Sequence, residues 1–297
     1  MYLTVHNLFW LLLTGSAIGV LGAILGIGGG VFIVPALVLI FNIPVHHAIA
    51  TSIVSVIATS SAATSTNVEK GLVNMRLGMT LEIGTVLGAM SGALTAEWLS
   101  EATLLRIFSV VLLVGAALLG WKSGKGETSK SSTDLQVRHQ GESGVNTGSP
   151  NDAPEELGLL GASFYDPAEG RQISYRVRKA PLGFLASLVA GNLSGLLGVG
   201  CGFINVPMIH LVCGVPMKAA TATSTFMIGV TGAASAFIYF GRGEVRPALT
   251  TAVILGVLVG SFTGAVISHR LPGRLIQAIF AVFLLPVAWQ MFVQAGL

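Results

Sequence analysis

Gly26-Ile-Gly-Gly-Gly-Val-Phe-Ile-Val-Pro35 breaks an otherwise continuous apolar segment near the start of the chain. Its three consecutive glycines have no Cβ, so the backbone can turn sharply there and another group can approach it closely. The apolar run resumes at Val31, which predicts a helix end, a tight turn and a second helix. Unpaired N–H groups at the start of that second helix would suit an anion. The alternative is a close helix-packing site, because glycine is frequent in membrane helices.

The same pattern recurs 172 residues later as Gly198-Val-Gly-Cys-Gly-Phe-Ile-Asn-Val-Pro207. At this fixed offset roughly 30 of about 100 aligned positions are identical without any gap, including Ala50-Thr51-Ser52 and Ala222-Thr223-Ser224. A repeat of this length indicates two copies of one structural unit. Two glycine-broken membrane segments in corresponding positions predict a transporter site near the membrane midplane, between the repeats.

The composition is typical of an all-α polytopic membrane protein. The 297 residues are 53% hydrophobic and only 10% charged, and their mean hydropathy is +0.79. Sixteen of the charged residues fall in 122–180, so the net charge of +3 indicates no nucleic-acid partner. Cys201 and Cys213 lack metal-ligand spacing, and we expect neither a metal nor a cofactor. The N-terminus has no basic region before its apolar run, so we expect no cleaved signal peptide.

Each repeat is predicted to hold one glycine-broken re-entrant hairpin and three transmembrane helices. The first repeat is 1–121, with its hairpin at 8–41 and its spans at 47–66, 72–96 and 103–121. The second repeat is 181–297, with its hairpin at 182–213 and its spans at 219–239, 248–268 and 275–293. The arm 31–41 rises only about 16 Å, which is too short for about 30 Å of hydrocarbon. Because three crossings are odd, the second copy must be inverted, although counting the hairpins as full spans would change the crossing number.

The distribution of basic residues predicts the orientation of the chain in the membrane. If the linker between the repeats is cytoplasmic, thirteen Lys and Arg residues lie inside and only Arg106, Arg242 and Arg246 lie outside. The linker has two parts. Residues 122–158 are rich in Ser, Gly, Thr and charge and are predicted to be disordered. Residues 159–180 are predicted to form a small cytoplasmic β-hairpin around Asp166-Pro-Ala-Glu-Gly170 that docks on the membrane domain or on a partner.

These residues carry a resemblance to a known family. The twice-repeated glycine hairpin followed by a proline, with Ala50-Thr51-Ser52 and Ala222-Thr223-Ser224, resembles the TauE/SafE (TSUP) sulfite exporter family of membrane transporters. The resemblance covers the whole chain except 122–154. It implies transport, often as efflux, of sulfite, thiosulfate, organosulfonates such as sulfoacetate, or related organic anions. Cys201 and Ser194 stand where the first copy has Gly29 and Gly22, so the two halves of a pocket need not be equivalent.

The polar residues beside the two glycine tips are the candidate anion site. A sulfite or sulfonate group offers three acceptor oxygens, which backbone N–H groups and hydroxyls can match without a buried Lys or Arg. Hydroxyls near helix starts can equally serve only as caps, and Asn192 can equally bond two helices together. The candidate binding residues are Gly28, Gly29, Gly30, Thr51, Ser52, Asn192, Gly200, Cys201, Gly202, Asn205, Thr223 and Ser224.

Glu82 is the one acid well inside a predicted span. Acids at membrane depth are costly and commonly mark ion or proton paths, so Glu82 is the candidate for proton coupling. The alternative is a polar bond to a neighbouring helix. The predicted function is therefore a secondary transporter, an exporter in a cell membrane, that moves a small sulfur-containing anion by alternating access with protons. An anion channel and a membrane-embedded enzyme with Cys201 as nucleophile are the alternatives, and a homo-oligomer is left open.

Overall fold

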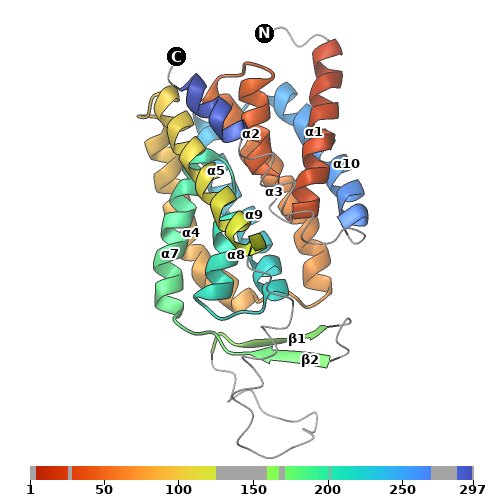
Figure 1. The fold of residues 1–297 in the computed structure, drawn as a ribbon, viewed down its shortest axis with the longest axis vertical. Coiled ribbons are helices and arrows are strands. Elements are labelled where there is room, and N and C mark those ends of the chain that lie inside the picture. The colour runs from red at the N-terminus through yellow and green to blue at the C-terminus, as the bar shows by residue number, and fades with distance from the viewer. Residues whose placement is uncertain are drawn as a thin grey trace, which may run out of the picture.

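The structure is a computed structural model that describes residues 5–25, 29–124, 159–166, 171–200, 202–268 and 286–295. Most of the predicted disordered linker 122–158 lies outside these residues, as do Gly28, Cys201 and much of the predicted span 275–293. The described part is mainly helical, with one small sheet (Figure 1).

The helices follow the predicted segments closely. The first repeat forms α1 (Val5–Leu25), α2 (Gly30–Leu39), α3 (Val45–Glu69), α4 (Met75–Ala96) and α5 (Glu101–Gly124). The second forms α7 (Ala180–Leu197), α8 (Gly202–Leu211), α9 (Met217–Gly241) and α10 (Pro247–Ser268), and residues 286–294 are also helical. Among the described residues, five helices are long and apolar enough to cross a membrane: α3, α4, α7, α9 and 247–264 of α10. Exposed Ile83, Leu87 and Phe262 on these helices suit a lipid surface.

The sequence repeat is also a repeat of structural elements. Adding 172 to the first and last residues of α2, α3 and α4 gives the bounds of α8, α9 and α10 to the residue. Identical bounds are expected if the glycine turn and the proline that precedes each long helix act in the same way in both copies. Pro44 is the N-cap of α3 and Pro216 is the N-cap of α9, with nearly the same φ and ψ.

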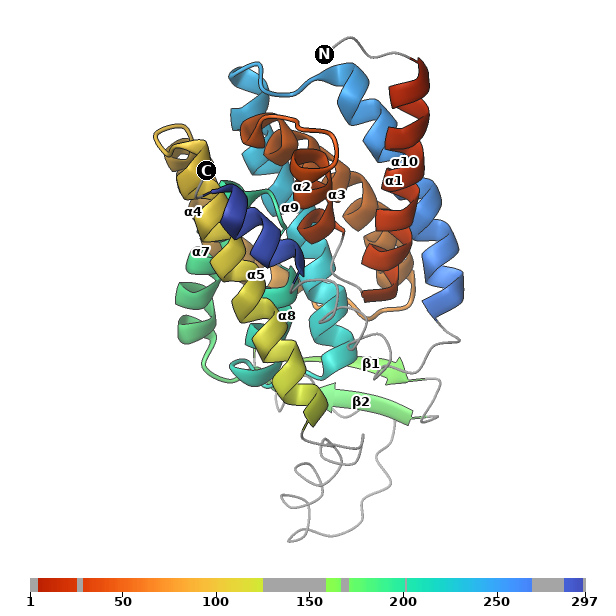
Figure 2. The same cartoon turned by 45° about the horizontal axis from the view of Figure 1, so that its top comes forward.

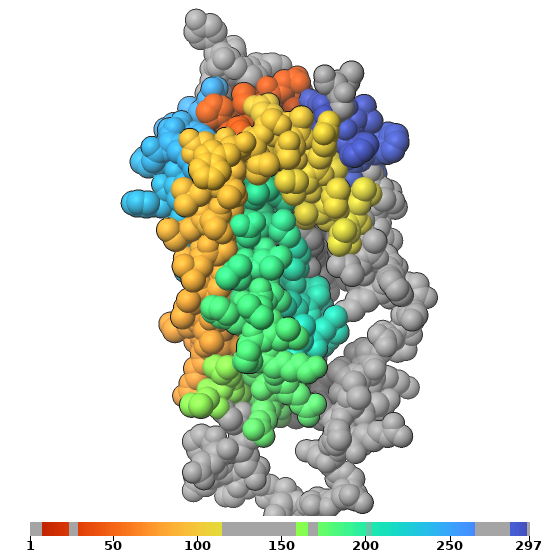
Figure 3. All heavy atoms as spheres, turned by 90° about the vertical axis from the view of Figure 1, so that its left-hand side faces the viewer, coloured from red at the N-terminus to blue at the C-terminus, as the bar shows by residue number. Residues whose placement is uncertain are grey.

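Helices α3 and α9 lie at the centre and run in opposite directions. The ring of His47, near the start of α3, is 2.7 Å from the carbonyl of Glu244, just after α9. Helix α4 runs alongside α9 in the same direction, since Asn74 bonds Thr223 at one end and Arg242 bonds Ala93 at the other. The pairs α1 with α10 and α4 with α7 flank this centre (Figure 2). Figure 3 shows the face on which α4 and α7 lie side by side.

Glycines let the flanking helices come into backbone contact. A Cβ on Gly88 of α4 would collide with the carbonyl of Leu188 on α7. A Cβ on Gly260 of α10 would likewise collide with the carbonyl of Ser16 on α1. Small residues at such positions allow the close packing that joins membrane helices.

The two hairpins have arms of unequal length. Helix α1 has 21 residues and rises about 31 Å, whereas the ten residues of α2 rise about 15 Å. Both hairpins begin and end on one face. In the first, α1 runs parallel to α10 and α2 leads back to the start of α3, and in the second, α7 runs parallel to α4 and α8 leads back to the start of α9. Each hairpin is therefore one long helix followed by a short returning half-helix.

The predicted β-hairpin is confirmed as β1 (Ala162–Asp166) paired antiparallel with β2 (Arg171–Tyr175), although its turn lies outside the described residues. Phe164 and Tyr175 are buried against the ends of α4, α8 and α9, and the amide of Asn74 donates to the carbonyl of Leu160. Burial also raises the pKa of the Tyr175 hydroxyl. The sheet thus docks on the helical bundle, and we call that end the strand face and the opposite end the distal face (Figure 1).

Candidate functional site

The two glycine tips meet at the centre of the bundle. Gly29 precedes α2 with φ +75°, and Gly198 and Gly200 adopt φ +69° and +74° before α8, a backbone conformation that favours glycine. A Cβ on Gly30 would lie 2.8 Å from the carbonyl oxygen of Val199, so the tips are in direct contact. The N–H groups of Gly30 and Val31 lie in the first turn of α2, where no carbonyl within the helix can accept them.

Ser52 ties the two tips together. Its hydroxyl lies 2.7 Å from the carbonyl oxygen of Gly198 and 3.3 Å from that of Gly30, and the side chain is fully buried. Thr51 is buried as well, and its hydroxyl lies 3.3 Å from the hydroxyl of Thr250 on α10. The structure therefore places Ser52 between the tips and turns Thr51 toward α10.

A cavity of about 200 Å³ reaches the first tip from the strand face. It extends from buried Gly29 to exposed Thr66, which lies near the end of α3. Its walls come from α1, α3, α9 and α10, and none of the described residues that line it is a Lys or Arg. The lining residues are Gly19, Gly22, Ala23, Gly29, Thr59, Ser60, Ala62, Ala63, Thr66, Thr225, Val257, Ser261 and Phe262.

Hydroxyls supply most of the polar atoms of this cavity. Those of Ser60, Thr225 and Ser261 donate to carbonyls three or four residues earlier in their own helices. The hydroxyl of Thr59 does the same toward Ser55 and Val56. Such intrahelical bonds are easily exchanged when a hydroxyl rotates, so each side chain can offer its proton to a ligand. Sequence reasoning missed Thr59, Ser60 and Ser261 as site residues. The repeat offered one indication of Thr59, because the residue at the fixed offset, Thr231, also carries a hydroxyl.

The other candidate residues are more scattered. Gly202 begins α8, and the hydroxyl of Thr223 accepts the N–H of Asn74. Among the described residues, the Ser224 hydroxyl and the Asn205 amide oxygen are buried without a hydrogen-bond partner. Asn192 instead donates to Ser91 and joins α7 to α4. This is the alternative given above, in which Asn192 bonds two helices together.

Glu82 is buried on α4, as predicted, with only 7% of its surface exposed. One carboxylate oxygen accepts a 2.7 Å hydrogen bond from the hydroxyl of Thr231 on α9, and the other is buried without a partner among the described residues. The position that matches Glu82 in the second repeat is Ile254. This carboxyl group therefore has no counterpart in the other half of the molecule.

The described residues contain no group of three or more His, Cys, Asp or Glu side chains placed to hold a metal ion. Cys213 is a buried free thiol at the strand face, and burial raises its pKa, which disfavours the reactive thiolate. Cys201, the nucleophile of the alternative enzyme interpretation, lies outside the described residues.

Comparison with known proteins identifies the family. The family model described as "Sulfite exporter TauE/SafE" matches residues 11–291. The chain is 25% identical over 288 residues to the probable membrane transporter protein YunE of Bacillus subtilis, covering 95% of this chain and 96% of that one. It is 23% identical over 272 residues to YdhB of the same organism, also named a probable membrane transporter, covering 91% and 93%.

A plant relative, the sulfite exporter TauE/SafE family protein 6 of Arabidopsis thaliana, is 35% identical over 104 residues, covering 32% of this chain and 23% of that one. No solved structure shows a significant match to the chain. The resemblance stated from the glycine hairpins is thus confirmed. The chain belongs to the sulfite exporter TauE/SafE family, and it is a multi-pass membrane transporter rather than an enzyme.

Proposed function

We propose that the protein is a secondary transporter that exports a small sulfur-containing anion, such as sulfite, thiosulfate or an organosulfonate like sulfoacetate. The observation that carries this proposal is the cavity that ends at Gly29, where a half-helix begins inside the bundle. Unpaired N–H groups and a partial positive charge at that helix end would attract an anion. Because no Lys or Arg is among the described residues that line the cavity, the helix end and the hydroxyls are the groups proposed to bind the anion.

Alternating access would follow from two inverted-topology repeats. The opposite directions of α3 and α9, together with the identical bounds of the matched helices, support this arrangement. In transporters built this way, one repeat rocks against the other around a fixed central site. The contact between Gly30 and Val199 lies at this centre, and the cavity gives access to it from the strand face. In this mechanism the observed cavity would be the access path of a state open at the strand face.

We expect the strand face to be cytoplasmic. Lys70 and Arg76 flank the α3–α4 connection on this face, and eight further Lys and Arg residues lie in 122–180, whereas the distal face holds Arg106, Arg242 and Arg246. Single cysteines introduced at Ser143 and Gly296 would be treated with a membrane-impermeant maleimide in intact cells. Labelling is expected at 296 and not at 143. Labelling at 143 but not at 296 would reverse the orientation.

The cavity hydroxyls should contribute to anion affinity. Thr59→Val is expected to weaken binding by about 1.5–3 kcal/mol, the value of one hydrogen bond to a charged group, or roughly 10- to 150-fold in Kd. Thr80→Val is the matched control, since Thr80 also donates to a carbonyl four residues earlier but is exposed on α4. Equal anion affinities of the two variants would show that the cavity is not part of the binding site.

The substrate is best identified by ligand-induced stabilisation of the purified protein. Sulfite, thiosulfate, sulfoacetate, taurine and lactate would be screened by thermal shift, because a ligand that binds only the folded state raises Tm with its concentration. Stabilisation by at least one sulfur anion, lost in the Thr59→Val variant, is the expected result. Stabilisation by lactate alone would shift the proposal to carboxylates.

A further inference from the structure

The fixed offset assigns the cavity a symmetry-related counterpart at the distal face. The eight residues that match its α1 and α3 walls are Gly191, Ser194 and Gly195 on α7, and Thr231, Gly232, Ala234, Ser235 and Ile238 on α9. Six of them are buried, and Ala234 and Ile238 are half-buried. The open cavity at the strand face therefore corresponds to a more closed region at the opposite end of the bundle.

Tyr239 closes this region from the side of α9. The side chain is fully buried, and its hydroxyl donates a 2.9 Å hydrogen bond to the carbonyl of Gly195 on α7. At the open end the matching residue is Asn67, which is only half-buried. The aromatic ring thus stands where the other repeat has a short polar side chain.

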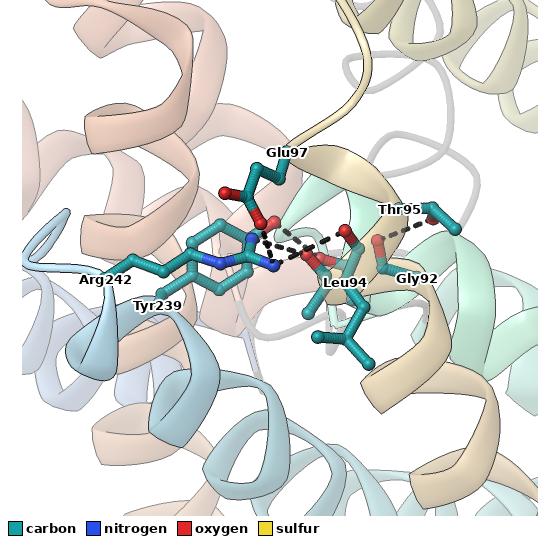
Figure 4. Close-up of polar contacts among 8 residues, drawn as sticks. Gly92, Leu94, Thr95, Glu97, Tyr239 and Arg242 are labelled. Atoms are coloured by element: carbon teal, nitrogen blue, oxygen red, sulfur yellow. Dashed lines mark hydrogen bonds and ion pairs between the residues drawn. The ribbon is translucent and has the colours of Figure 1, made fainter.

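Arg242 adds a second closure one turn further along (Figure 4). Its guanidinium donates to the carbonyl of Ala93 at 2.8 Å and to that of Leu94 at 3.4 Å, and it lies 2.9 Å from the carboxylate of Glu97. These carbonyls belong to the last turn of α4, where acceptors lack partners within the helix and the helix dipole favours a cation. At the open end the matching residue is Lys70, which is exposed.

We propose that Tyr239, Arg242 and Glu97 form a latch that holds a second access path closed at the distal face and that releases when the transporter opens on that side. The latch joins α9 to α4 and α7, so releasing it would free the distal ends of these helices to separate. The inference rests on the proposed alternating access, because a protein with one fixed opening would have no use for a releasable closure.

The test measures cysteine accessibility in purified protein in lipid nanodiscs, where both faces are exposed. In a background with Cys201 and Cys213 replaced by Ser, Ser235→Cys reports on the distal path and Ala63→Cys reports on the cavity. Arg242→Gln and Tyr239→Phe are each expected to raise the rate of Ser235→Cys modification about fivefold and to lower that of Ala63→Cys, because destabilising one state shifts the population to the other. Glu97→Gln should raise the rate of Ser235→Cys modification only about twofold, since the Glu97 side chain is 57% exposed and its ion pair is screened.

Arg246→Gln and Glu101→Gln are the matched controls, because they remove the same charges from exposed positions on the distal face. Melting temperatures of all variants identify any that fail to fold, and Tyr239→Phe removes only one hydroxyl. Rates for Arg242→Gln and Tyr239→Phe that equal those of the controls would overturn the latch. If those rates stay unchanged while the unmodified protein exchanges anion across vesicles, only the latch fails. If they rise and no anion is exchanged, the proposed function fails instead.

Discussion

Gly29→Val is expected to abolish detectable anion binding while the protein still folds and inserts. Gly29 lies at φ +75°, which L side chains rarely adopt, although an added Cβ would find its nearest neighbours, Ile18 and Val257, at 3.9 Å. A valine at position 29 therefore fits sterically but strains the backbone by about 1–3 kcal/mol. Relief of that strain would turn the N–H groups of Gly30 and Val31 away from the end of the cavity. A branched side chain would also fill part of the space beside the tip.

Gly71→Val is the matched control for this substitution. Gly71 has φ +65° and nothing within 4 Å of an added Cβ, so valine there produces the same kind of backbone strain away from the cavity. Both variants should lose a similar amount of melting temperature, but only Gly29→Val should lose anion affinity. If the glycine tip serves packing alone, both would lose stability and keep affinity. Normal binding by Gly29→Val would contradict the proposed role of the helix end.

Glu82→Gln is expected to leave anion binding intact and to reduce pH-gradient-driven transport by about tenfold or more. Glutamine keeps the size of the side chain and can still accept the hydrogen bond from Thr231, so the fold should be retained. It cannot take up or release a proton. Because a charged carboxylate with one unpaired oxygen is costly in a buried site, gain and loss of a proton would be tied to the opening of the path around it.

Uptake into vesicles with an imposed pH gradient would be compared for the unmodified protein, Glu82→Gln and Glu101→Gln. The last variant removes an exposed carboxylate at the start of α5 and should behave as the unmodified protein does. Unchanged gradient-driven uptake by Glu82→Gln would remove Glu82 from the coupling mechanism and leave it as a hydrogen-bonded link between α4 and α9.

The sequence predicted the helices well because the signals for them are local. The glycine runs and the prolines that cap α3 and α9 stop and start helices by backbone geometry alone, and the fixed offset transferred each boundary from one repeat to the other. The packing of α1 along α10 was harder to foresee. Periodicity and composition do not reveal how deep a hairpin arm reaches, since that depends on its packing along α10.

The polar site was predicted less completely because it depends on contacts between distant residues. Ser52 was expected to bind the anion, yet its hydroxyl lies between the carbonyls of the two tips. Thr59 and Ser261 line the cavity because α3 and α10 present them toward the end of α1, which no local pattern indicates. The contact of Tyr239 with Gly195 likewise joins residues that are 44 positions apart.

A counterflow experiment tests most directly whether this family member carries a small sulfur anion through the bundle by alternating access. Purified protein in sealed vesicles loaded with unlabelled sulfite or sulfoacetate would be diluted into a trace of the ³⁵S-labelled anion. We expect labelled anion to accumulate transiently above its external concentration. This accumulation should require unlabelled anion inside, and Gly29→Val should eliminate it. Influx that only equilibrates and does not depend on internal anion would indicate a channel. Failure of every small sulfur anion to exchange, in protein shown to be folded, would contradict the proposed function.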